Sequence, residues 1–136
     1  MLQPANISGM PRIRLLHWKA AEAGEYIELL QAAGHRVEYE PELRPGLMRI
    51  WRASPPDAFV IDLSRLPSHG REIATALRQS RATRTVPIVF CEGAEDKVAR
   101  VRSELPDASY CSRKTLRAAL RQALKQRVAA PVVPTQ

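Results

Sequence analysis

The sequence predicts one α/β domain in which a five-stranded parallel sheet is covered by helices on both faces. Short apolar segments alternate along the chain with segments of helical periodicity, which is the pattern of repeated strand–helix units. Two of the apolar segments are almost uniformly hydrophobic, as strands buried on both faces of a parallel sheet should be. The chain has 136 residues, which suits one domain with a sizeable core and is too short for two ordinary domains.

Strands and helices are expected in strict alternation. The expected strands cover residues 12–17, 35–40, 58–62, 86–91 and 109–111. The expected helices cover residues 20–33, 47–53, 69–80, 94–105 and 115–128. Parallel strands need crossover connections, and right-handed crossovers place helices on both faces. The expected architecture is therefore a doubly wound, three-layer α/β/α sandwich.

Local signals support each element of the first half. The strand over 12–17 is short and apolar, and the helix that follows it ends at Gly34. Residues 35–40 alternate as a half-exposed strand does. Pro45 delays the start of the next helix, and a Pro-Pro pair after Ala53 ends it. These first two strands are the less apolar ones and are expected toward an edge of the sheet.

The second half is more strongly apolar. The strands over 58–62 and 86–91 are nearly all hydrophobic and are expected at the centre of the sheet. The helix between them turns three residues inward, namely Ile73, Ala74 and Leu77. The last helix carries an i, i+4 stripe formed by Leu116, Leu120, Leu124 and Val128.

The ordered domain is expected to span residues 12–128. The segments 1–11 and 129–136 have no periodicity and are expected to be flexible tails. No apolar run approaches the length of a membrane span, and the N-terminal stretch lacks the basic start and apolar run of a signal peptide. We therefore expect a cytoplasmic protein without a membrane partner.

The formal net charge of +7 is unevenly distributed along the chain. Residues 1–70 hold eight Lys and Arg against eight Asp and Glu, whereas residues 71–136 hold thirteen against six. A one-sided basic field attracts nucleic acid or an acidic protein surface, although it is more often a solvated face. Cys91 and Cys111 are too few for a disulfide framework and lack metal-ligand spacing, so two reduced thiols are expected.

Asp62 has the most informative position, because it ends the third expected strand. In an open parallel sheet, ligands and reacting groups gather at the carboxyl ends of the strands. Gly70 follows eight residues later, and Thr-Val-Pro-Ile-Val at 85–89 enters the fourth strand. With these features and its five strand–helix units, the chain resembles the receiver domain of bacterial response regulators, the flavodoxin-like family that includes CheY. The resemblance covers about residues 12–127.

The resemblance implies a phosphorylation site that this chain carries only in part. In the family, the strand-three aspartate accepts a phosphoryl group from a histidine kinase, and two acidic residues after strand one hold magnesium. Here His17, Trp18 and Lys19 stand in the place of the acidic pair and supply none of the oxygen ligands that magnesium prefers. Trp18 is expected to fill the vacant metal site or to belong to a partner surface.

The other residues expected around the crevice are charged. In the family, a hydroxyl residue after strand four and a lysine after strand five contact the phosphoryl group. Glu92 stands in place of the hydroxyl and would repel a phosphoryl group, whereas Arg113 and Lys114 stand near the lysine position. We predict that Asp62 remains ionised as a structural ion by pairing with Lys19, Arg113 or Lys114.

The sequence therefore predicts a degenerate receiver, or pseudo-receiver, that acts in signalling by protein–protein contact. No cofactor is expected, because the magnesium site is interpreted as lost. No enzyme is expected, because the nucleophile and oxyanion motifs of common enzymes are absent from the sequence. Two alternatives stay open: a single-domain response regulator with Asp62 as phosphoacceptor, and a basic module associated with nucleic acid.

The last helix provides the expected contact surface. On a helical wheel, Arg117, Arg121 and Lys125 lie together along one edge of the apolar stripe. The resemblance gives this ridge a role in binding an unidentified signalling protein, or in homodimerisation through the last two helices. The competing interpretation is a solvated helix with favourable cations near its C-terminus. Nucleic-acid binding is disfavoured, because no helix-turn-helix follows.

Overall fold

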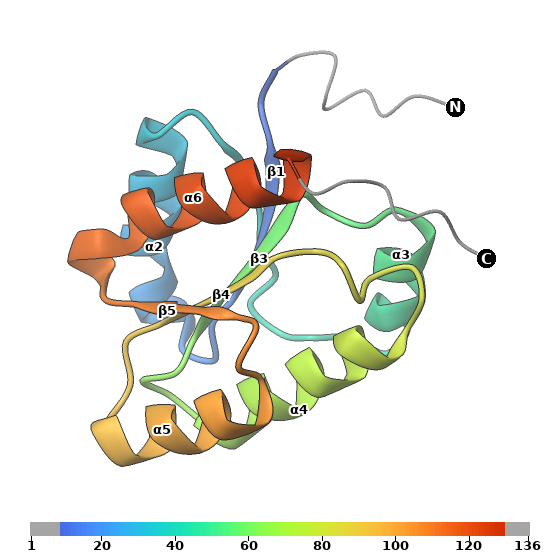
Figure 1. Ribbon diagram of the computed structural model, residues 1–136. Coiled ribbons are helices and arrows are strands. Elements are labelled where there is room, and N and C mark those ends of the chain that lie inside the picture. The colour runs from blue at the N-terminus through green and yellow to red at the C-terminus, as the bar shows by residue number, and fades with distance from the viewer. Residues whose placement is uncertain (1–8, 130–136) are drawn as a thin grey trace.

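The computed structural model describes residues 9–129 (Figure 1). Its strands are β1 (Arg12–Leu16), β2 (Arg36–Glu38), β3 (Ala58–Asp62), β4 (Ile88–Cys91) and β5 (Ser109–Cys111). Its helices are α2 (Ala20–Ala32), α3 (Leu47–Ala53), α4 (Pro67–Gln79), α5 (Glu95–Glu104) and α6 (Leu116–Ala129), with the 3-10 turn η1 (Arg113–Thr115) leading into α6.

All neighbouring strands pair in parallel, in the order β2-β1-β3-β4-β5. This is the strand order of the doubly wound, flavodoxin-like sheet, so the predicted fold class is confirmed. The short, half-exposed strand β2 lies at an edge, as expected. β1 lies next to it, second from that edge, and its run from Ile13 to Leu16 is buried between β2 and β3.

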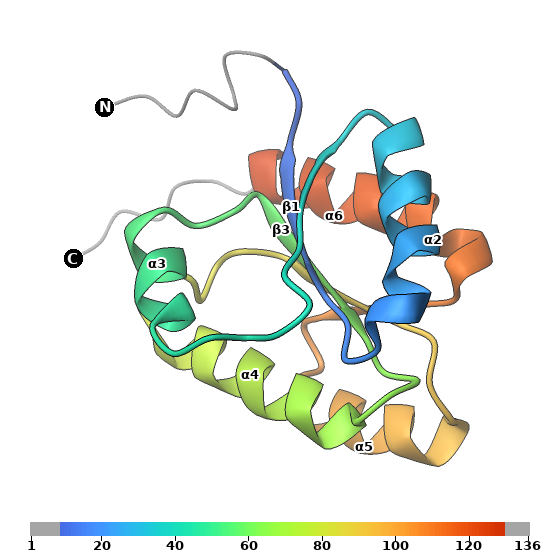
Figure 2. The ribbon, with the colours of Figure 1, turned by 180° about the vertical axis from the view of Figure 1, so that it is seen from behind.

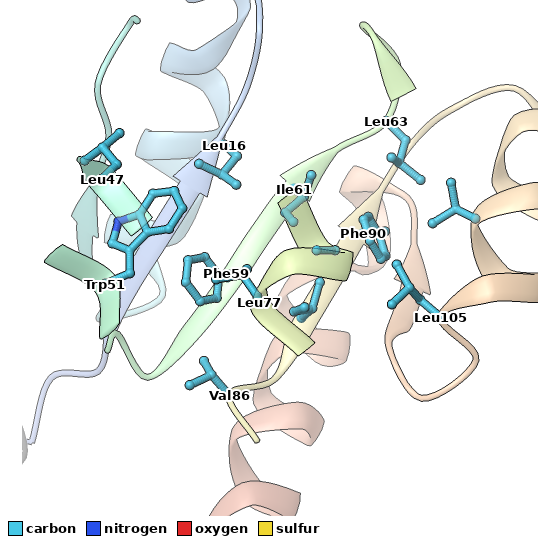
Figure 3. Close-up of a cluster of buried hydrophobic side chains, with 13 residues drawn as sticks. Leu16, Leu47, Trp51, Phe59, Ile61, Leu63, Leu77, Val86, Phe90 and Leu105 are labelled. Atoms are coloured by element: carbon cyan, nitrogen blue, oxygen red, sulfur yellow. The ribbon is translucent and has the colours of Figure 1, made fainter. Parts of the chain in front are cut away.

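Successive side chains of each strand point to opposite faces, which divides the core into two clusters. α3, α4 and α5 cover one face, and α2 and α6 cover the other (Figure 1, Figure 2). The first cluster, shown in Figure 3, includes Leu16, Trp51, Phe59, Ile61, Leu77 and Phe90. The second cluster includes Ile13, Leu15, Leu30, Val60, Val89 and Leu120.

Proline explains two shifted boundaries. The strand predicted over 86–91 begins at Ile88, because Pro87 has no N–H group to donate to the sheet. The helix predicted over 69–80 begins at Pro67, because the fixed φ of proline suits the first turn of a helix. Leu66, which precedes that helix, has a left-handed φ of 46°.

Some predictions fall outside the described residues. These are nearly all of the expected tails 1–11 and 129–136, and the side chain of Val128. In the described part of the stripe, Leu116 and Leu120 are buried and Leu124 packs against the same cluster. None of the helices in residues 9–129 has the length and apolar content that a membrane span requires.

Candidate functional site

A cavity of about 580 Å³ lies at the carboxyl ends of β1, β3 and β4, where parallel sheets place their ligands. Its lining combines buried polar side chains with a charged rim. The residues that matter for its chemistry are His17, Glu22, Glu25, Tyr26, Asp62, Ser64, Arg65, Glu92 and Arg113. Asp62 is only 1% exposed, so the properties of this cavity depend on how its carboxylate is stabilised.

The carboxylate of Asp62 is saturated with hydrogen bonds. Alternation along β3 turns Asp62, like Val60, toward the face covered by α2 and α6. Its Oδ1 accepts from the Ser64 N–H at 2.8 Å, the Ser64 hydroxyl at 2.6 Å and the Arg65 N–H at 3.2 Å. Its Oδ2 accepts from the Tyr26 hydroxyl at 2.5 Å. These hydrogen bonds replace the solvation that the buried carboxylate loses.

Tyr26 reaches Asp62 from the buried side of α2. It shares the buried side of that helix with Ala23 and Leu30, which is the position that its spacing predicts for a core residue. Burial, together with hydrogen bonds to Asp62 and Cys91, raises the pKa of Tyr26 far above its ordinary value of 10.0. The hydroxyl therefore remains a proton donor at neutral pH.

His17 lies between β1 and α2 with its side chain buried. Its Nδ1 accepts the Lys19 N–H at 3.1 Å, so the proton of the neutral ring sits on Nε2. That Nε2 lies 3.6 Å from Asp62 Oδ2 and 3.8 Å from Glu22 Oε1. The ring meets Tyr26 edge to face, with 5.4 Å between the ring centroids. His17 therefore contributes a polar N–H toward two carboxylates.

Glu22 and Arg65 form one side of the rim. Arg65 binds the Glu22 carboxylate in a bidentate manner, at 3.1 Å from Nε and 2.5 Å from Nη2. Lys19 Nζ lies 3.8 Å from the same carboxylate. The hydrogen bond from Arg65, with the nearby positive charges, lowers the pKa of Glu22 to about 2. Glu22 is therefore an ionised, cation-bound group at neutral pH.

Arg113 forms the other side of the rim. Its backbone N–H donates to Glu92 Oε2 at 2.7 Å, and its guanidinium pairs with both Glu25 and Glu92. The guanidinium also lies 6.0 Å from the centroid of the Tyr26 ring. Glu92 has a left-handed φ of 67° and precedes Gly93, whose φ of 110° suits glycine. Arg113 therefore covers the site with its charge directed at rim carboxylates.

The predicted ion pair between Asp62 and Lys19, Arg113 or Lys114 is wrong for the described residues. Lys19 and Arg113 bind other carboxylates, and Lys114 is exposed. The basic side chain that approaches Asp62 is His17. The physical reason is that two hydroxyls and two backbone amides already stabilise the carboxylate, so a full positive charge is not required.

The predicted crevice residues divide into two sets. His17, Glu92 and Arg113 line the cavity, whereas Trp18, Lys19 and Lys114 do not. The Trp18 ring packs beside α4, 6.0 Å from the His69 ring and near Gly70, and does not fill the cavity.

Sequence reasoning missed several members of the site, namely Glu22, Glu25, Ser64 and Arg65. Charged residues of this kind resemble ordinary solvated surface in a sequence, and only Glu22, in the first turn of a helix, carries a local signal. For Tyr26, the helical spacing with Ala23 and Leu30 predicts only a place in the core. The feature that could have indicated its role in the site is the hydroxyl, because a buried tyrosine usually finds a hydrogen-bond partner.

The donor set suits magnesium poorly. Magnesium requires oxygen ligands in near-octahedral geometry, whereas both oxygens of Asp62 already accept hydrogen bonds. Glu22 and Glu25 are each held by an arginine, and His17 presents nitrogen. Across residues 9–129, no group of three or more His, Cys, Asp or Glu side chains is placed to hold a metal ion.

Solved structures resemble this chain, although neither a protein-family model nor a curated protein sequence matches it. A response-regulator receiver domain protein from Clostridium thermocellum aligns with a TM-score of 0.70 and 17% identity, covering 88% of this chain and 98% of that one. A sensor protein from Polaromonas aligns with a TM-score of 0.69 and 21% identity, covering 86% and 98%.

A third similar structure is the receiver domain of a sensor histidine kinase from Pseudomonas aeruginosa. Its TM-score is 0.62 at 21% identity, and the alignment covers 89% of this chain and 99% of that domain. That protein was solved with a magnesium ion coordinated in its active-site cleft. At these identities the comparisons show that the chain has the CheY-like receiver fold over nearly the full length of a receiver domain.

Proposed function

We propose that this chain is a receiver-like signalling domain that works by protein–protein contact and does not use Asp62 as a phosphoacceptor. The likeness to receiver domains supports the signalling role. The hydrogen bonding of Asp62 carries the second part of the proposal, because both oxygens of its buried carboxylate are occupied by donors.

Phosphoryl transfer needs an accessible nucleophile and a cation that neutralises developing charge. An incoming phosphoryl group would have to displace the Tyr26 hydroxyl from Asp62 Oδ2. It would also meet the rim carboxylates of Glu22, Glu25 and Glu92. In the proposed function Asp62 is a structural acceptor that ties α2 and the loop after β3 to the end of the sheet, and the magnesium site is lost.

Acetyl phosphate labelling tests this proposal. Purified protein incubated with acetyl phosphate and magnesium should keep its mass, as measured by intact mass spectrometry. Asp62→Asn supplies the background, and Tyr26→Phe tests whether the hydroxyl alone blocks the carboxylate. A phosphoryl adduct on the wild type that disappears in Asp62→Asn would instead establish a phosphorylatable response regulator.

The partner surface of the proposed function is the basic ridge of α6, defined as Arg117, Arg121 and Lys125. All three side chains are exposed. The ion pairs found within residues 9–129 involve other side chains, so the ridge charges are not neutralised by a neighbouring carboxylate. Charge complementarity favours an acidic protein surface as its partner.

Charge reversal tests the ridge. The variant with Arg117, Arg121 and Lys125 replaced by glutamate should fold normally, because exposed substitutions each change stability by about 0.5 kcal/mol or less. It should associate more slowly with an acidic partner, and the difference should shrink at high salt. Sedimentation of both proteins would show whether the partner is a second copy of the chain.

A matched variant controls for net charge. Glutamate at Arg49, Arg52 and Arg81 makes the same charge change on exposed positions of α3 and of the turn after α4, away from the last two helices. This control should retain the partner. If both variants lost partner binding equally, the effect would come from net charge, and the ridge would not be the partner surface. Loss of duplex DNA binding with strong salt dependence would favour the nucleic-acid module.

A further inference from the structure

Cys91 and Cys111 are neighbours at the carboxyl edge of the sheet. They are paired positions of the adjacent parallel strands β4 and β5. The preceding residues, Phe90 and Tyr110, stack on each other on the face covered by α3, α4 and α5. Alternation therefore turns both cysteines to the opposite face, where both belong to the same cluster.

The spacing of the two cysteines suits a covalent bond between them. Adjacent strands lie about 4.7–4.9 Å apart, which falls within the range of about 4.4–6.8 Å between the Cα atoms of disulfide-bonded cysteines. The Cys111 thiol donates to the Phe90 carbonyl at 3.5 Å, and the two thiols lie close enough to shift each other's pKa. Both are free thiols in this structure.

The two thiols differ in access and in acidity. Cys91 is fully buried, whereas Cys111, on the edge strand β5, is half-buried. Hydrogen bonding to Cys111 and burial raise the pKa of Cys91, and the same hydrogen bond lowers the pKa of Cys111. Because the thiolate is the reactive form, Cys111 is the thiol that an oxidant in solution meets first.

We propose that Cys91 and Cys111 are a modification site, a dithiol that a hydroperoxide converts into a reversible intramolecular disulfide. The Cys111 thiolate attacks the terminal oxygen of the hydroperoxide and breaks the O–O bond. This step yields a sulfenic acid, and the other oxygen leaves after protonation as an alcohol, or as water when the oxidant is hydrogen peroxide. The Cys91 sulfur then attacks Cys111 Sγ. The sulfenic hydroxyl leaves with the Cys91 proton as water, so two thiols and one hydroperoxide are consumed.

The strand geometry makes this disulfide a labile one. The Cβ atoms of paired residues in parallel strands stand side by side at about the strand spacing, whereas a disulfide draws them to about 3.5–4.5 Å. Closing the bond therefore pulls β4 and β5 together, and strained disulfides are the more easily reduced ones. This inference is independent of the proposed signalling function, because it involves neither a phosphoryl group nor a partner.

Peptide mapping of the wild-type protein tests the proposal without a mutation. Trypsin cleaves after Arg84, Lys97, Arg102 and Arg113, which places the two cysteines in the separate peptides 85–97 and 103–113. After treatment with hydrogen peroxide, the intact monomer should lose two hydrogen atoms in mass and both free thiols together. The two peptides should appear cross-linked, and dithiothreitol should separate them.

Single variants resolve the two roles. Cys91→Ser leaves Cys111 without a resolving thiol, so Cys111 should accumulate oxygen adducts that dithiothreitol does not fully reverse. Cys111→Ser should leave Cys91 reduced at the same peroxide dose, because Cys91 is buried. Circular dichroism of each variant checks that it is folded.

Three results would overturn the proposal. The first is a wild-type protein that keeps both thiols at a peroxide dose that oxidises glutathione. The second is a disulfide that joins two chains and no cross-link within one. The third is oxidation of Cys91 that proceeds equally fast in folded Cys111→Ser.

Discussion

The two faces of the sheet are built from the same strands but bury different chemistry. Toward α3, α4 and α5, the strands present an apolar layer that includes Phe59, Ile61 and Phe90 (Figure 3). Toward α2 and α6, the last positions of β3 and β4 present Asp62 and Cys91. One face is therefore held mainly by hydrophobic packing, with the buried Arg14 lying over the Trp51 ring and paired with Glu38 and Glu40 at its β2 edge. The other face ends in a buried carboxylate.

The difference shows what a buried carboxylate requires. Moving a carboxylate out of water is costly unless hydrogen bonds replace its solvation. On the polar face the replacement comes from the Tyr26 hydroxyl on α2 and from the Ser64 and Arg65 amides after β3. On the apolar face, the carboxyl ends of β3 and β4 carry hydrophobic side chains such as Leu63 and Phe90, which need no hydrogen-bond partner.

The largest effect is expected on the apolar face. Phe59→Ala should destabilise the fold by about 3–5 kcal/mol, because it removes a fully buried ring that packs at 5.3 Å between centroids against Trp51. Urea unfolding followed by circular dichroism measures this change. If Phe59→Ala lost less free energy of unfolding than Asp62→Ala or Tyr26→Phe, the expected order of the two faces would be wrong.

Removal of the buried carboxylate should rank second. Asp62→Ala leaves the Tyr26 hydroxyl without its acceptor and should cost about 3 kcal/mol in the same urea assay, since an unsatisfied buried donor is penalised. In an active receiver, the phosphoacceptor lies in an acidic pocket, and its neutralisation relieves repulsion. Unchanged or increased stability of Asp62→Ala would therefore contradict the structural role of Asp62.

The smallest effect is expected for the hydroxyl alone. Tyr26→Phe should cost about 2 kcal/mol at neutral pH, the typical contribution of a hydrogen bond to a charged group. Tyr39→Phe is the matched control, because the Tyr39 hydroxyl is buried and has no hydrogen-bond partner among residues 9–129. Tyr39→Phe should leave stability almost unchanged, and equal losses in both variants would indicate a packing effect.

Alkaline pH sharpens the same test. The pKa of Tyr26 is raised in the folded state, so folding favours the protonated hydroxyl. Its contribution is complete below the ordinary pKa of 10.0 and is lost progressively as the pH rises above it. Unfolding at increasing pH should therefore show a decline in wild-type stability that is smaller in Tyr26→Phe.

The accuracy of the sequence predictions followed the range of the interactions involved. The apolar run of β3 placed Asp62 at a strand tip, and the structure has the strand with the predicted bounds. The prediction of its partner failed partly because one donor, Tyr26, lies 36 residues away on a helix. The nearby Ser64 and Arg65 donors were missed as well, because the turn that aims them at the carboxylate is not visible in the sequence. The position of Tyr26 on the apolar side of α2 carried no information about which acceptor it would meet.

The sequence by itself determined the order and type of the elements, the position of Asp62 and the exposed basic edge of the last helix. Each of these depends on periodicity within a few neighbouring residues, which a single sequence records. Only the tertiary structure decided that the Tyr26 hydroxyl donates to the Asp62 carboxylate and that Arg65 and Arg113 bind rim carboxylates. It also decided that Cys91 and Cys111 are paired positions of neighbouring strands. These contacts depend on how distant segments dock, and a shift of one residue in strand register turns a side chain to the other face.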